Sequence, residues 1–175
     1  MYIMIPAWID GTLQPVDKLE AHKLGLKHKA ISVFLFHNNK ILLQRRALGK
    51  YHTPGLWANT CCTHPYWNET DIDCANRRVF EELHLTGLEL KNRGKIEYRA
   101  DVGQGLIEHE IVEIFTATCS AAPKVTPNPE EVMEIKWLDQ IELTNKVATN
   151  PDEFTPWLRI YMSKHFEQIS GTITA

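Results

Sequence analysis

Short apolar blocks separated by turn residues occupy the first third of the chain, and this pattern predicts strands. Residues 30–36 are rich in Val, Ile and Phe, and a second apolar block follows at 41–44 after an Asn-containing turn. Two such blocks around a short turn predict a β-hairpin. The apolar N-terminus, residues 1–6, is expected to form a short strand, and residues 56–62 are expected to be extended after a Pro-Gly turn.

The hydrophobic period lengthens to between three and four residues from position 69 onward. Apolar side chains then recur at Ile72, Ala75, Val79 and Leu83. This spacing predicts an amphipathic helix that ends near Gly87.

Strands return in the second half of the chain. They are predicted at residues 95–100, 106–118 and 132–138, with a loop at residues 123–129, which hold three prolines. Apolar and aromatic residues between 154 and 169 predict a C-terminal helix that begins near Pro156. Strands outnumber the two predicted helices, so we expect one domain over residues 1–175, of the α+β class or an α/β/α sandwich.

Composition and charge narrow the class of protein. The 175 residues are 43% hydrophobic and carry a net charge of −3, which excludes a disordered chain and argues against a general nucleic-acid binder. No apolar run approaches the roughly 18 residues of a membrane span, and the N-terminus lacks the basic region of a signal peptide. Four cysteines, two of them adjacent at Cys61 and Cys62, do not suggest a disulfide framework, so we expect a cytoplasmic protein. The sequence leaves both a monomer and a dimer open.

Three histidines and two glutamates are candidate metal ligands. His22 and His28 lie in one short stretch, and His64 lies in a segment without charged residues. Glu108 and Glu110 are two positions apart in a predicted strand, so both face one side of the sheet and repel each other unless a cation lies between them. Scattered surface histidines and a solvated edge strand are the alternative explanation. Brought together, these groups suit Mn²⁺, Zn²⁺ or Fe²⁺ better than Mg²⁺.

The predicted helix also carries charged residues in the order of the Nudix pattern G-x5-E-x7-R-E-U-x-E-E-x-G-U, in which U is aliphatic. The register matches at Glu69, Arg77, Glu81, Glu82 and Leu85. It departs at three positions, where Thr63, Arg78 and His84 replace Gly, Glu and Gly. The glutamate lost at Arg78 weakens a hydrolase interpretation, because pyrophosphate hydrolysis needs clustered carboxylates to hold Mg²⁺. An ordinary amphipathic helix with charged faces is the alternative.

Basic residues supply a candidate anion site. Arg46 and Lys50 flank a flexible Ala-Leu-Gly turn that suits the binding of an anion. Lys18 and Arg78 are further candidates, and a solvated surface is the alternative for each of the four.

Taken together, four stretches of the chain resemble type I isopentenyl-diphosphate Δ-isomerase of the Nudix superfamily. They are residues 21–28, Arg45-Arg46-Ala47-Leu48-Gly49-Lys50, Cys61-Cys62-Thr63-His64-Pro65 and Glu108-His109-Glu110. The resemblance runs from about Trp8 to Tyr161. It implies a Nudix-like fold, with a mixed sheet flanked by helices, and the reversible conversion of isopentenyl diphosphate to dimethylallyl diphosphate in isoprenoid biosynthesis.

The resemblance also implies roles for individual residues. One divalent metal, Mn²⁺ or Mg²⁺ with Zn²⁺ as a further candidate, is expected on His22, His28, His64, Glu108 and Glu110. Cys62 and Glu110 are expected to form the acid/base pair that moves the double bond through a tertiary carbocation. Glu82 is expected to help hold a Mg²⁺ bound with the substrate diphosphate. The expected contacts of that diphosphate are Lys18, Arg46, Lys50 and Arg78.

Strand alternation refines these assignments. Cys62 is preferred because it keeps the Cys-x-His spacing, and Cys61 is expected to point to the opposite face. His109, where asparagine is more usual, is expected to face away from the site. Tyr98 and Trp157 are candidates to stabilise the carbocation, and ordinary core packing is the alternative for both.

Two other functions fit parts of the sequence. One is a Nudix hydrolase of nucleoside or dinucleotide diphosphates, which Arg78 argues against. The other is a non-catalytic metal or nucleotide-diphosphate binding module, which has no use for an acid/base pair. We therefore expect an isomerase with a small-molecule diphosphate substrate and no nucleic-acid or membrane partner.

Overall fold

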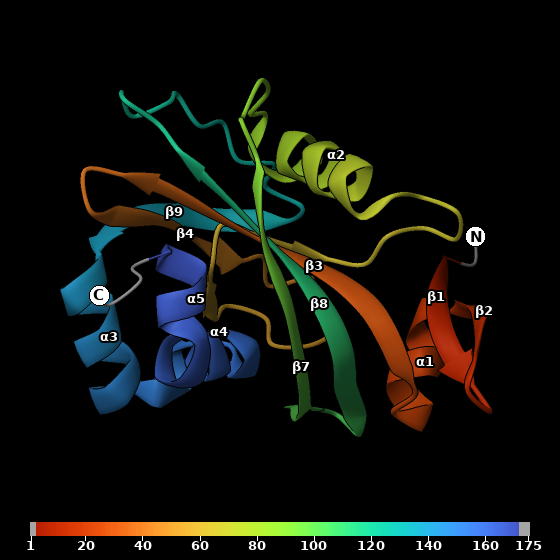
Figure 1. Ribbon diagram of the computed structural model, residues 1–175. Helices are drawn as coiled ribbons and strands as arrows, with labels where there is room; N and C mark the ends of the chain where they lie inside the picture. The colour runs from red at the N-terminus through yellow and green to blue at the C-terminus, as the bar shows by residue number, and fades with distance from the viewer. Residues whose placement is uncertain (1–2, 172–175) are drawn as a thin grey trace.

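Strand β3, Lys27–His37, runs through the middle of the molecule and organises the sheet. The computed structural model describes residues 3–171, and within that range nine strands form one sheet (Figure 1). β3 is parallel to β8, Leu106–Thr118, along ten residue pairs. The other pairings of the sheet are antiparallel, so the sheet is mixed, as the resemblance implied.

The opposite edge of β3 is shared by three antiparallel partners. Strand β1, Met4–Ile9, pairs near its start, β6, Cys61–Thr63, pairs in the middle, and β4, Lys40–Arg46, pairs at the end. Because these partners diverge from β3 in different directions, side chains from several elements meet beside its first half.

The remaining elements extend the sheet and cover it. The other strands are β2, Thr12–Asp17, β5, Trp57–Ala58, β7, Lys91–Gly103, and β9, Val132–Asp139. The helices are α1, Lys18–Leu24, α2, Asp71–Leu83, α3, Gln140–Thr149, α4, Pro156–Ile160, and α5, Phe166–Ser170. A 3₁₀ turn, Pro151–Glu153, precedes α4, and a π-helical turn, Tyr161–His165, joins α4 to α5.

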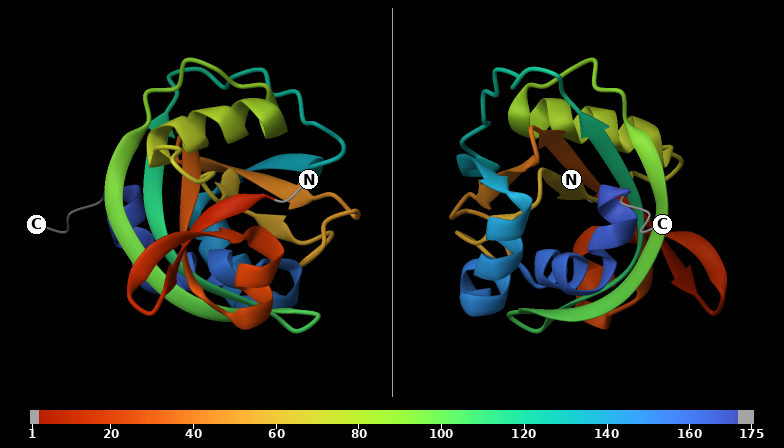
Figure 2. Two further views of the ribbon diagram at one scale, coloured as in Figure 1. Left: turned by 90° about the vertical axis from the view of Figure 1, so that its right-hand side faces the viewer. Right: turned by 60° about the vertical axis from the view of Figure 1, so that its left-hand side comes forward.

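Helices lie on both faces of the sheet. Figure 1 shows α2 above it and α3, α4 and α5 gathered below it, and Figure 2 shows the same separation from two other sides. Alternate residues of β3 pack toward the two layers: Ala30 and Phe34 belong to the core under α3–α5, whereas Ile31 and Val33 belong to the core under α2. This layering confirms the expected α/β/α sandwich.

Helix α2 has defined caps at both ends. The Thr70 hydroxyl accepts a hydrogen bond from the Asp73 amide at 3.2 Å, which caps the first turn. The helix ends at Leu83, earlier than the apolar pattern predicted, because His84 adopts a left-handed conformation with φ of 53°. The amide of His84 still donates to the Phe80 carbonyl at 2.8 Å, so the chain turns away immediately after the last helical residue.

The predicted apolar face of α2 is largely confirmed. Ala75, Val79 and Leu83 are buried against the sheet. Ile72 is 39% exposed, however, and Cys74 is buried instead. Burial on α2 therefore begins at Cys74, and Ile72 in the first turn lies outside the packed part of the helix.

The strands agree with the predictions in place and differ in length. Within the described residues the N-terminal strand is Met4–Ile9, which extends beyond the predicted end at residue 6; residues 1 and 2 of the prediction lie outside the described residues. The extended segment at 56–62 consists of two very short strands, β5 and β6. β8 has the predicted bounds, 106–118, whereas β7 extends at both ends, to Lys91 and Gly103, and leaves only a tight turn at 104–105.

The prediction of two helices was wrong. Helix α1 has only seven residues, too few for a clear period, and is stabilised by the Asp17 cap and by Gly25 with φ of 60°. In α3, the buried Leu143 and Val147 are four residues apart, but the 74% exposed Ile141 obscures the pattern. The C-terminal helix does begin at Pro156, as predicted. None of the helices within the described chain is both long and apolar enough to cross a membrane.

Candidate active site

Four side chains from different parts of the fold converge beside the first half of β3. His22 lies on α1, His28 on β3, His64 directly after β6, and Glu110 on β8. The parallel register of β3 and β8 places His28 beside Glu110. One ligand atom from each of the four lies within 4.8 Å of the others, and all four residues are buried. The structure therefore brings together four of the five expected metal ligands in one group.

The imidazoles of this group are oriented as metal ligands. Nδ1–H of His22 donates to the Lys18 carbonyl oxygen and Nδ1–H of His28 to that of Leu26, each at 2.7 Å. Each ring thus directs its Nε2 inward. Among residues 3–171 neither Nε2 makes a hydrogen bond, and that of His28 lies 3.5 Å from Oε1 of Glu110. A buried polar atom without a partner costs about 1–3 kcal/mol. A divalent cation satisfies such lone pairs, so these residues fit a metal ion.

Burial also keeps the imidazoles in the form that binds metal. Desolvation, with a smaller contribution from His28, lowers the pKa of His22 to about 4. Desolvation and the nearby Lys18 hold the pKa of His64 well below its usual value. Both rings are therefore neutral at pH 7 and carry a free lone pair.

Glu108 and Glu110 lie on the buried side of a central strand. β8 pairs with β3 on one edge and with β7 on the other, so the solvated edge-strand alternative is wrong. The β7–β8 register places Tyr98 opposite Glu110, and the Tyr98 hydroxyl lies 2.8 Å from a Glu108 oxygen and 2.7 Å from a Glu110 oxygen. One O–H can donate to only one carboxylate at a time.

The pKa values of the two carboxylates are shifted in opposite directions. Desolvation and repulsion by Glu110 raise the pKa of Glu108 well above its usual value. Desolvation also acts on Glu110, but the imidazoles of His28 and His64 outweigh it and hold the pKa of Glu110 well below its usual value. A proton or a cation between the two carboxylates relieves their repulsion.

The Cys62 thiol lies in a hydrogen-bonded niche next to this cluster. The β3–β6 register pairs Ser32 with Cys62, and the two side chains lie 3.1 Å apart at Oγ and Sγ. The thiol donates to Oδ1 of Asn59 at 2.8 Å, and Ser32 Oγ lies 3.0 Å from the Tyr161 hydroxyl. Burial raises the pKa of Cys62 despite these bonds, so the thiol is protonated at neutral pH. Cys61 packs in the opposite core under α2, as predicted.

A fourth imidazole and a phenol, neither of them predicted from the sequence, also line the site. His52 is buried in the loop between β4 and β5, and its Nε2 lies 3.8 Å from Oε1 of Glu108. The ligand atoms of His22, His52 and Glu108 form another group within 4.8 Å. Burial and the nearby Arg46 lower the pKa of His52 to about 2, so this ring is also neutral. Tyr51 packs edge-on against His52 at 4.3 Å between ring centres.

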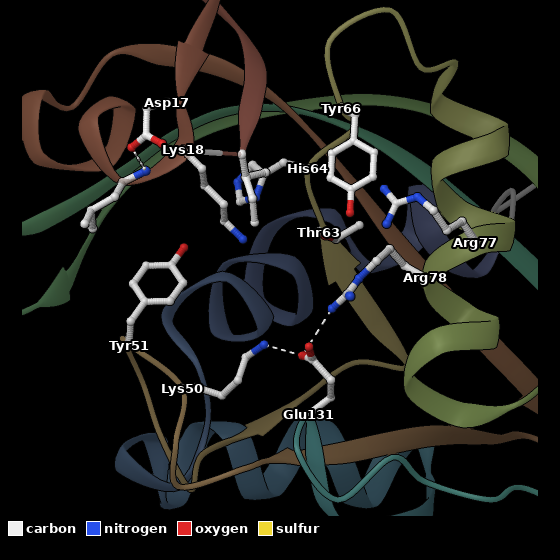
Figure 3. Close-up of a pocket in the computed structure, with 12 residues that line it drawn as sticks. Asp17, Lys18, Lys50, Tyr51, Thr63, His64, Tyr66, Arg77, Arg78 and Glu131 are labelled. Atoms are coloured by element: carbon white, nitrogen blue, oxygen red, sulfur yellow. Dashed lines mark hydrogen bonds and ion pairs between the residues drawn. The ribbon is translucent and has the colours of Figure 1, made fainter. Parts of the chain in front are cut away.

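Figure 3 shows a pocket lined by four cationic side chains, of which Arg77 is paired with Glu69 and the other three are Lys18, Lys50 and Arg78. The volume of the pocket is about 500 Å³. Lys18 comes from α1, Lys50 from the loop after β4, and Arg78 from α2. Desolvation, together with Lys50, Arg78 and Arg46, lowers the pKa of Lys18 to about 8. Positive charge gathered in this way favours an anion with several oxygens, such as a diphosphate.

One carboxylate already faces these cations. Glu131, which lies directly before β9, forms ion pairs with Lys50 and with Arg78, the latter at 3.1 Å (Figure 3). Desolvation opposes ionisation of Glu131, but Lys50 and Arg78 outweigh it and lower the pKa of this carboxyl. An incoming anion must therefore share these two cations with Glu131 or displace its carboxylate.

A smaller cavity of about 40 Å³ adjoins the cationic pocket. Both are lined by Lys18, Lys50, Tyr51, Thr63, His64 and Arg78. The smaller one is also lined by Cys62, Glu108 and Glu110. The cationic pocket thus adjoins an inner cavity, and a thiol and two carboxylates line that inner cavity.

The two predicted aromatic residues both reach the inner cavity. Trp157 is only 2% exposed, and the Arg46 guanidinium lies over its ring at 5.2 Å from the centre. Arg46 also donates to the His52 carbonyl at 3.1 Å, so it lines the inner cavity and not the outer pocket. Tyr98 presents its hydroxyl to the carboxylates and its ring to Tyr161.

Glu82 lies apart from both spaces. It is buried on α2, accepts a hydrogen bond from Gln44 Nε2 at 2.8 Å, and forms an ion pair with Arg78. Among the described residues that line the two cavities, Glu82 is absent. In this conformation Glu82 contacts the predicted phosphate ligand Arg78 and not the pocket itself.

Comparison with known proteins agrees with this arrangement. The NUDIX domain family matches residues 26–158. The protein of Dinoroseobacter shibae named "Isopentenyl-diphosphate Delta-isomerase" is 61% identical over 170 residues, which cover 97% of this chain and 97% of the relative. This chain belongs to the isopentenyl-diphosphate isomerase family of NUDIX proteins. A family member of the same name from Rhodobacter capsulatus is 56% identical and covers 98% of both chains.

Solved structures show the same fold at low sequence identity. The Deinococcus radiodurans protein DR0079 has a TM-score of 0.73 and 12% identity, covering 91% of this chain and 96% of that one. A MutT protein from Methanosarcina mazei has a TM-score of 0.62 and 14% identity, covering 78% of this chain and 90% of that one. These likenesses confirm the Nudix fold.

The glutamates at the positions of the Nudix pattern form ion pairs with two arginines of α2. Arg77 binds both oxygens of Glu69, at 2.6 and 2.7 Å, and Arg78 pairs with Glu81 and Glu82. The carboxylates at the predicted Nudix positions are therefore occupied by guanidinium groups. Arg78, at the position of a pattern glutamate, instead adds positive charge to the pocket.

Proposed function

We propose that this protein interconverts isopentenyl diphosphate and dimethylallyl diphosphate in isoprenoid biosynthesis. The observation that carries the proposal is the pairing of a protonated thiol, Cys62, with an ionised carboxylate, Glu110, in one small cavity that adjoins a cationic pocket. The substrate is complementary to this arrangement, because it joins a short branched hydrocarbon to a diphosphate.

The reaction moves a double bond by one carbon and needs one proton donor and one acceptor. A proton added to the terminal CH₂ carbon of the alkene gives a tertiary carbocation, and loss of a proton from the carbon on its other side gives the new alkene. Cys62 and Glu110 supply these two functions, and they exchange roles in the reverse direction. The hydrogen bond that Cys62 donates to Asn59 and its hydrogen bond with the Ser32 hydroxyl fix the position of the sulfur.

The metal of the proposed reaction is assigned to one site. Its proposed ligands are His22, His28, His64 and Glu110, which form one group, and Glu108, which forms a second group with His22 and His52. A divalent ion there supplies positive charge that fixes Glu110 and tunes its proton affinity. The mixed imidazole and carboxylate set suits Mn²⁺, with Mg²⁺ and Zn²⁺ as alternatives.

The diphosphate is assigned to the cationic pocket. Its proposed contacts are Lys18, Lys50 and Arg78 in this pocket and Arg46 in the adjoining inner cavity. When Arg78 turns toward the diphosphate, it releases Glu82, which can then help to hold a Mg²⁺ bound with the substrate. The proposal therefore includes an exchange of partners at Arg78 between the free and the bound protein.

The carbocation is assigned to the aromatic wall of the inner cavity. The face of a desolvated aromatic ring stabilises a cation by about 2 kcal/mol. Trp157 is buried and lines that cavity, and Tyr98 lines it from the side of the carboxylates. We also propose that residues 1–175 act as one cytoplasmic catalytic domain on this small diphosphate, without a nucleic-acid or membrane partner. Analytical ultracentrifugation distinguishes the monomer from the dimer.

Proton NMR of isopentenyl diphosphate incubated with the Mn²⁺- and Mg²⁺-loaded protein tests the function. The new methyl resonance of dimethylallyl diphosphate should appear and should be lost when a chelator is added. An unchanged spectrum with both metals present contradicts the proposal. Release of phosphate or nucleotide from a panel of nucleoside diphosphates would instead indicate a hydrolase.

A further inference from the structure

His52 places a fourth imidazole in the site, next to Glu108. Its side chain is 4% exposed, and its ring stacks on His22 with 5.9 Å between centres and 24° between planes. The ligand atoms of His22, His52 and Glu108 lie within 4.8 Å of one another. This group shares His22 with the His22–His28–His64–Glu110 group, so the two groups are continuous.

The hydrogen bonds of His52 leave one ring nitrogen directed at Glu108. Nδ1 lies 3.1 Å from the Thr53 hydroxyl, and the His52 carbonyl accepts from Arg46. Nε2 faces Oε1 of Glu108 at 3.8 Å, which is too long for a hydrogen bond. Two ligand atoms that are each about 2.1 Å from one metal lie up to about 4.2 Å apart, so this distance suits a shared cation.

The shared His22 limits the number of cations. Nδ1–H of His22 is used by the Lys18 carbonyl, which leaves a single lone pair on Nε2. One lone pair binds one metal ion. His52 and Glu108 therefore complete the same metal site and do not form a second one.

We propose that His52 is a direct ligand of the divalent metal, so that the site has four imidazoles with Glu108 and Glu110. This inference rests on the metal site of the proposed function and adds a ligand to it. Six protein donors can fill an octahedral shell, which leaves the metal to act on Glu110 and not on the diphosphate. Four imidazoles also shift the preference of the site from Mg²⁺ toward Zn²⁺, Co²⁺ and Mn²⁺.

NMR of the full-length wild-type protein with ¹⁵N-labelled histidine tests this assignment without a substitution. Addition of Zn²⁺ should move the Nε2 resonances of four histidines to metal-bound positions, and His52→Gln identifies the resonance of His52. A wild-type protein in which only three imidazoles bind Zn²⁺ would overturn the proposal.

Affinity for Zn²⁺, measured by competition with a chelating dye, gives a second readout. His52→Gln should weaken binding about tenfold or more. The matched control is His109→Gln, because His109 follows Glu108 directly on β8 but pairs with Glu97 at 3.3 Å. Equal affinities of wild type and His52→Gln contradict direct ligation. So does weaker binding by His52→Gln when the wild type shows three bound imidazoles, because His52 would then act only through Glu108.

The isomerase assay on the same preparations separates this inference from the proposed function. Turnover by a wild-type protein with three bound imidazoles removes His52 from the metal site and leaves the function intact. Four bound imidazoles without turnover, in the presence of both Mn²⁺ and Mg²⁺, support the ligand assignment and contradict the isomerase.

Discussion

The two faces of the central strands carry the same residue types and use them differently. On the face under α2, Cys61 is completely buried in an aliphatic core together with Cys74. On the other face, the adjacent Cys62 lines a cavity and shares hydrogen bonds with Ser32 and Asn59. One step along a strand therefore separates a cysteine that packs from a cysteine that can react.

The same contrast recurs on β8. Glu110 faces the cavity among imidazoles, whereas Glu113 faces the opposite side and bonds to Asn92 and Lys95. His109 also points away, as the alternation predicted, and pairs with Glu97. The comparison of the two faces shows that the candidate site residues are buried polar groups that lack a full set of hydrogen-bond partners and line a cavity. Cys61, Glu113 and His109 are thus matched controls for Cys62, Glu110 and the histidines of the site.

The largest expected effect is at the cysteines. Cys62→Ala should lower turnover roughly 100- to 10,000-fold, because it removes one member of the proton-transfer pair. Cys61→Ala should leave turnover within a few-fold of wild type and lower stability by about 1 kcal/mol, because it only opens a small space in the core. Steady-state kinetics and urea unfolding measure the two effects. Equal activities of the two variants would erase the contrast between the faces.

The carboxylates of β8 should differ almost as strongly. Glu110→Gln keeps the shape of the side chain but removes the charge, so turnover should fall at least about 100-fold. Glu113→Gln should retain near-normal turnover, since its partners lie on the solvated side. Turnover in the presence of excess Mn²⁺ is the measurement. A Glu110→Gln enzyme with normal turnover would remove the carboxylate from the reaction.

Metal binding should raise the free energy of unfolding, and only residues on the cavity face should be needed for this effect. At a free metal concentration of 100 times Kd, the wild type should gain about 2.7 kcal/mol of stability. His28→Gln should lose most of this gain, because His28 offers an orphaned Nε2 to the cluster. His109→Gln should keep it. Thermal unfolding with Mn²⁺ and with a chelator compares the three proteins, and an equal rise in Tm for all of them would contradict the assigned ligands.

Lys18, on the cavity face, should make the binding of an anion depend on pH, whereas a lysine on the α2 side should not. Desolvation and neighbouring cations lower the folded-state pKa of Lys18 to about 8, so its charge is lost as the pH rises through 8. The unfavourable effect of this charge on stability is fully present below that pH and is relieved as the pH rises toward the ordinary lysine value. Affinity for inorganic pyrophosphate should therefore weaken above pH 8.

Arginine at this position should keep its charge, so Lys18→Arg should bind pyrophosphate with a flatter pH profile. The control is Lys29→Met, because Lys29 lies on the α2 side and pairs with Asp71 at 3.4 Å. It should leave the wild-type profile unchanged. Isothermal titration calorimetry between pH 7 and about 9.5 covers this window. A wild-type affinity that does not change across it is inconsistent with the assigned role of Lys18.

The smallest expected effect is at Glu131. Glu131→Gln removes a carboxylate that competes for Lys50 and Arg78, so pyrophosphate should bind a few-fold more tightly. Glu134→Gln is the matched control, since Glu134 pairs with Arg45 at the surface. Weaker binding by Glu131→Gln would mean that Glu131 positions the two cations and does not compete for them.

The sequence predicted best those site residues that lie on strands. Alternation fixes which face a strand residue occupies, so Cys62 could be separated from Cys61 and the two β8 glutamates could be placed together. His52 and Glu131 come from loops, where no period exists, and only the tertiary contacts place them in the site. The one signal available for His52 is its position at the start of residues 52–68, a segment without charged residues that also contains His64.

The sequence also did not predict which side chains form ion pairs or where a short helix lies. The pattern placed Glu82 and Arg78 on one helix, but not in an ion pair that keeps Glu82 out of the pocket. Helix α1 was missed because its seven residues are held by caps and by burial of Ala21 and His22, not by an extended apolar period. That short helix nevertheless supplies a candidate metal ligand and the Lys18 cation.

The central claim is that Cys62 and Glu110 exchange protons with the substrate in the inner cavity. Deuterium NMR of isopentenyl diphosphate in D₂O, with the metal-loaded wild type, Cys61→Ala and Cys62→Ala, tests it most directly. The wild type and Cys61→Ala should give dimethylallyl diphosphate with deuterium in the new methyl group, and Cys62→Ala should give almost none. Product without deuterium from the wild type, or labelling by Cys62→Ala at the wild-type rate, would contradict the account.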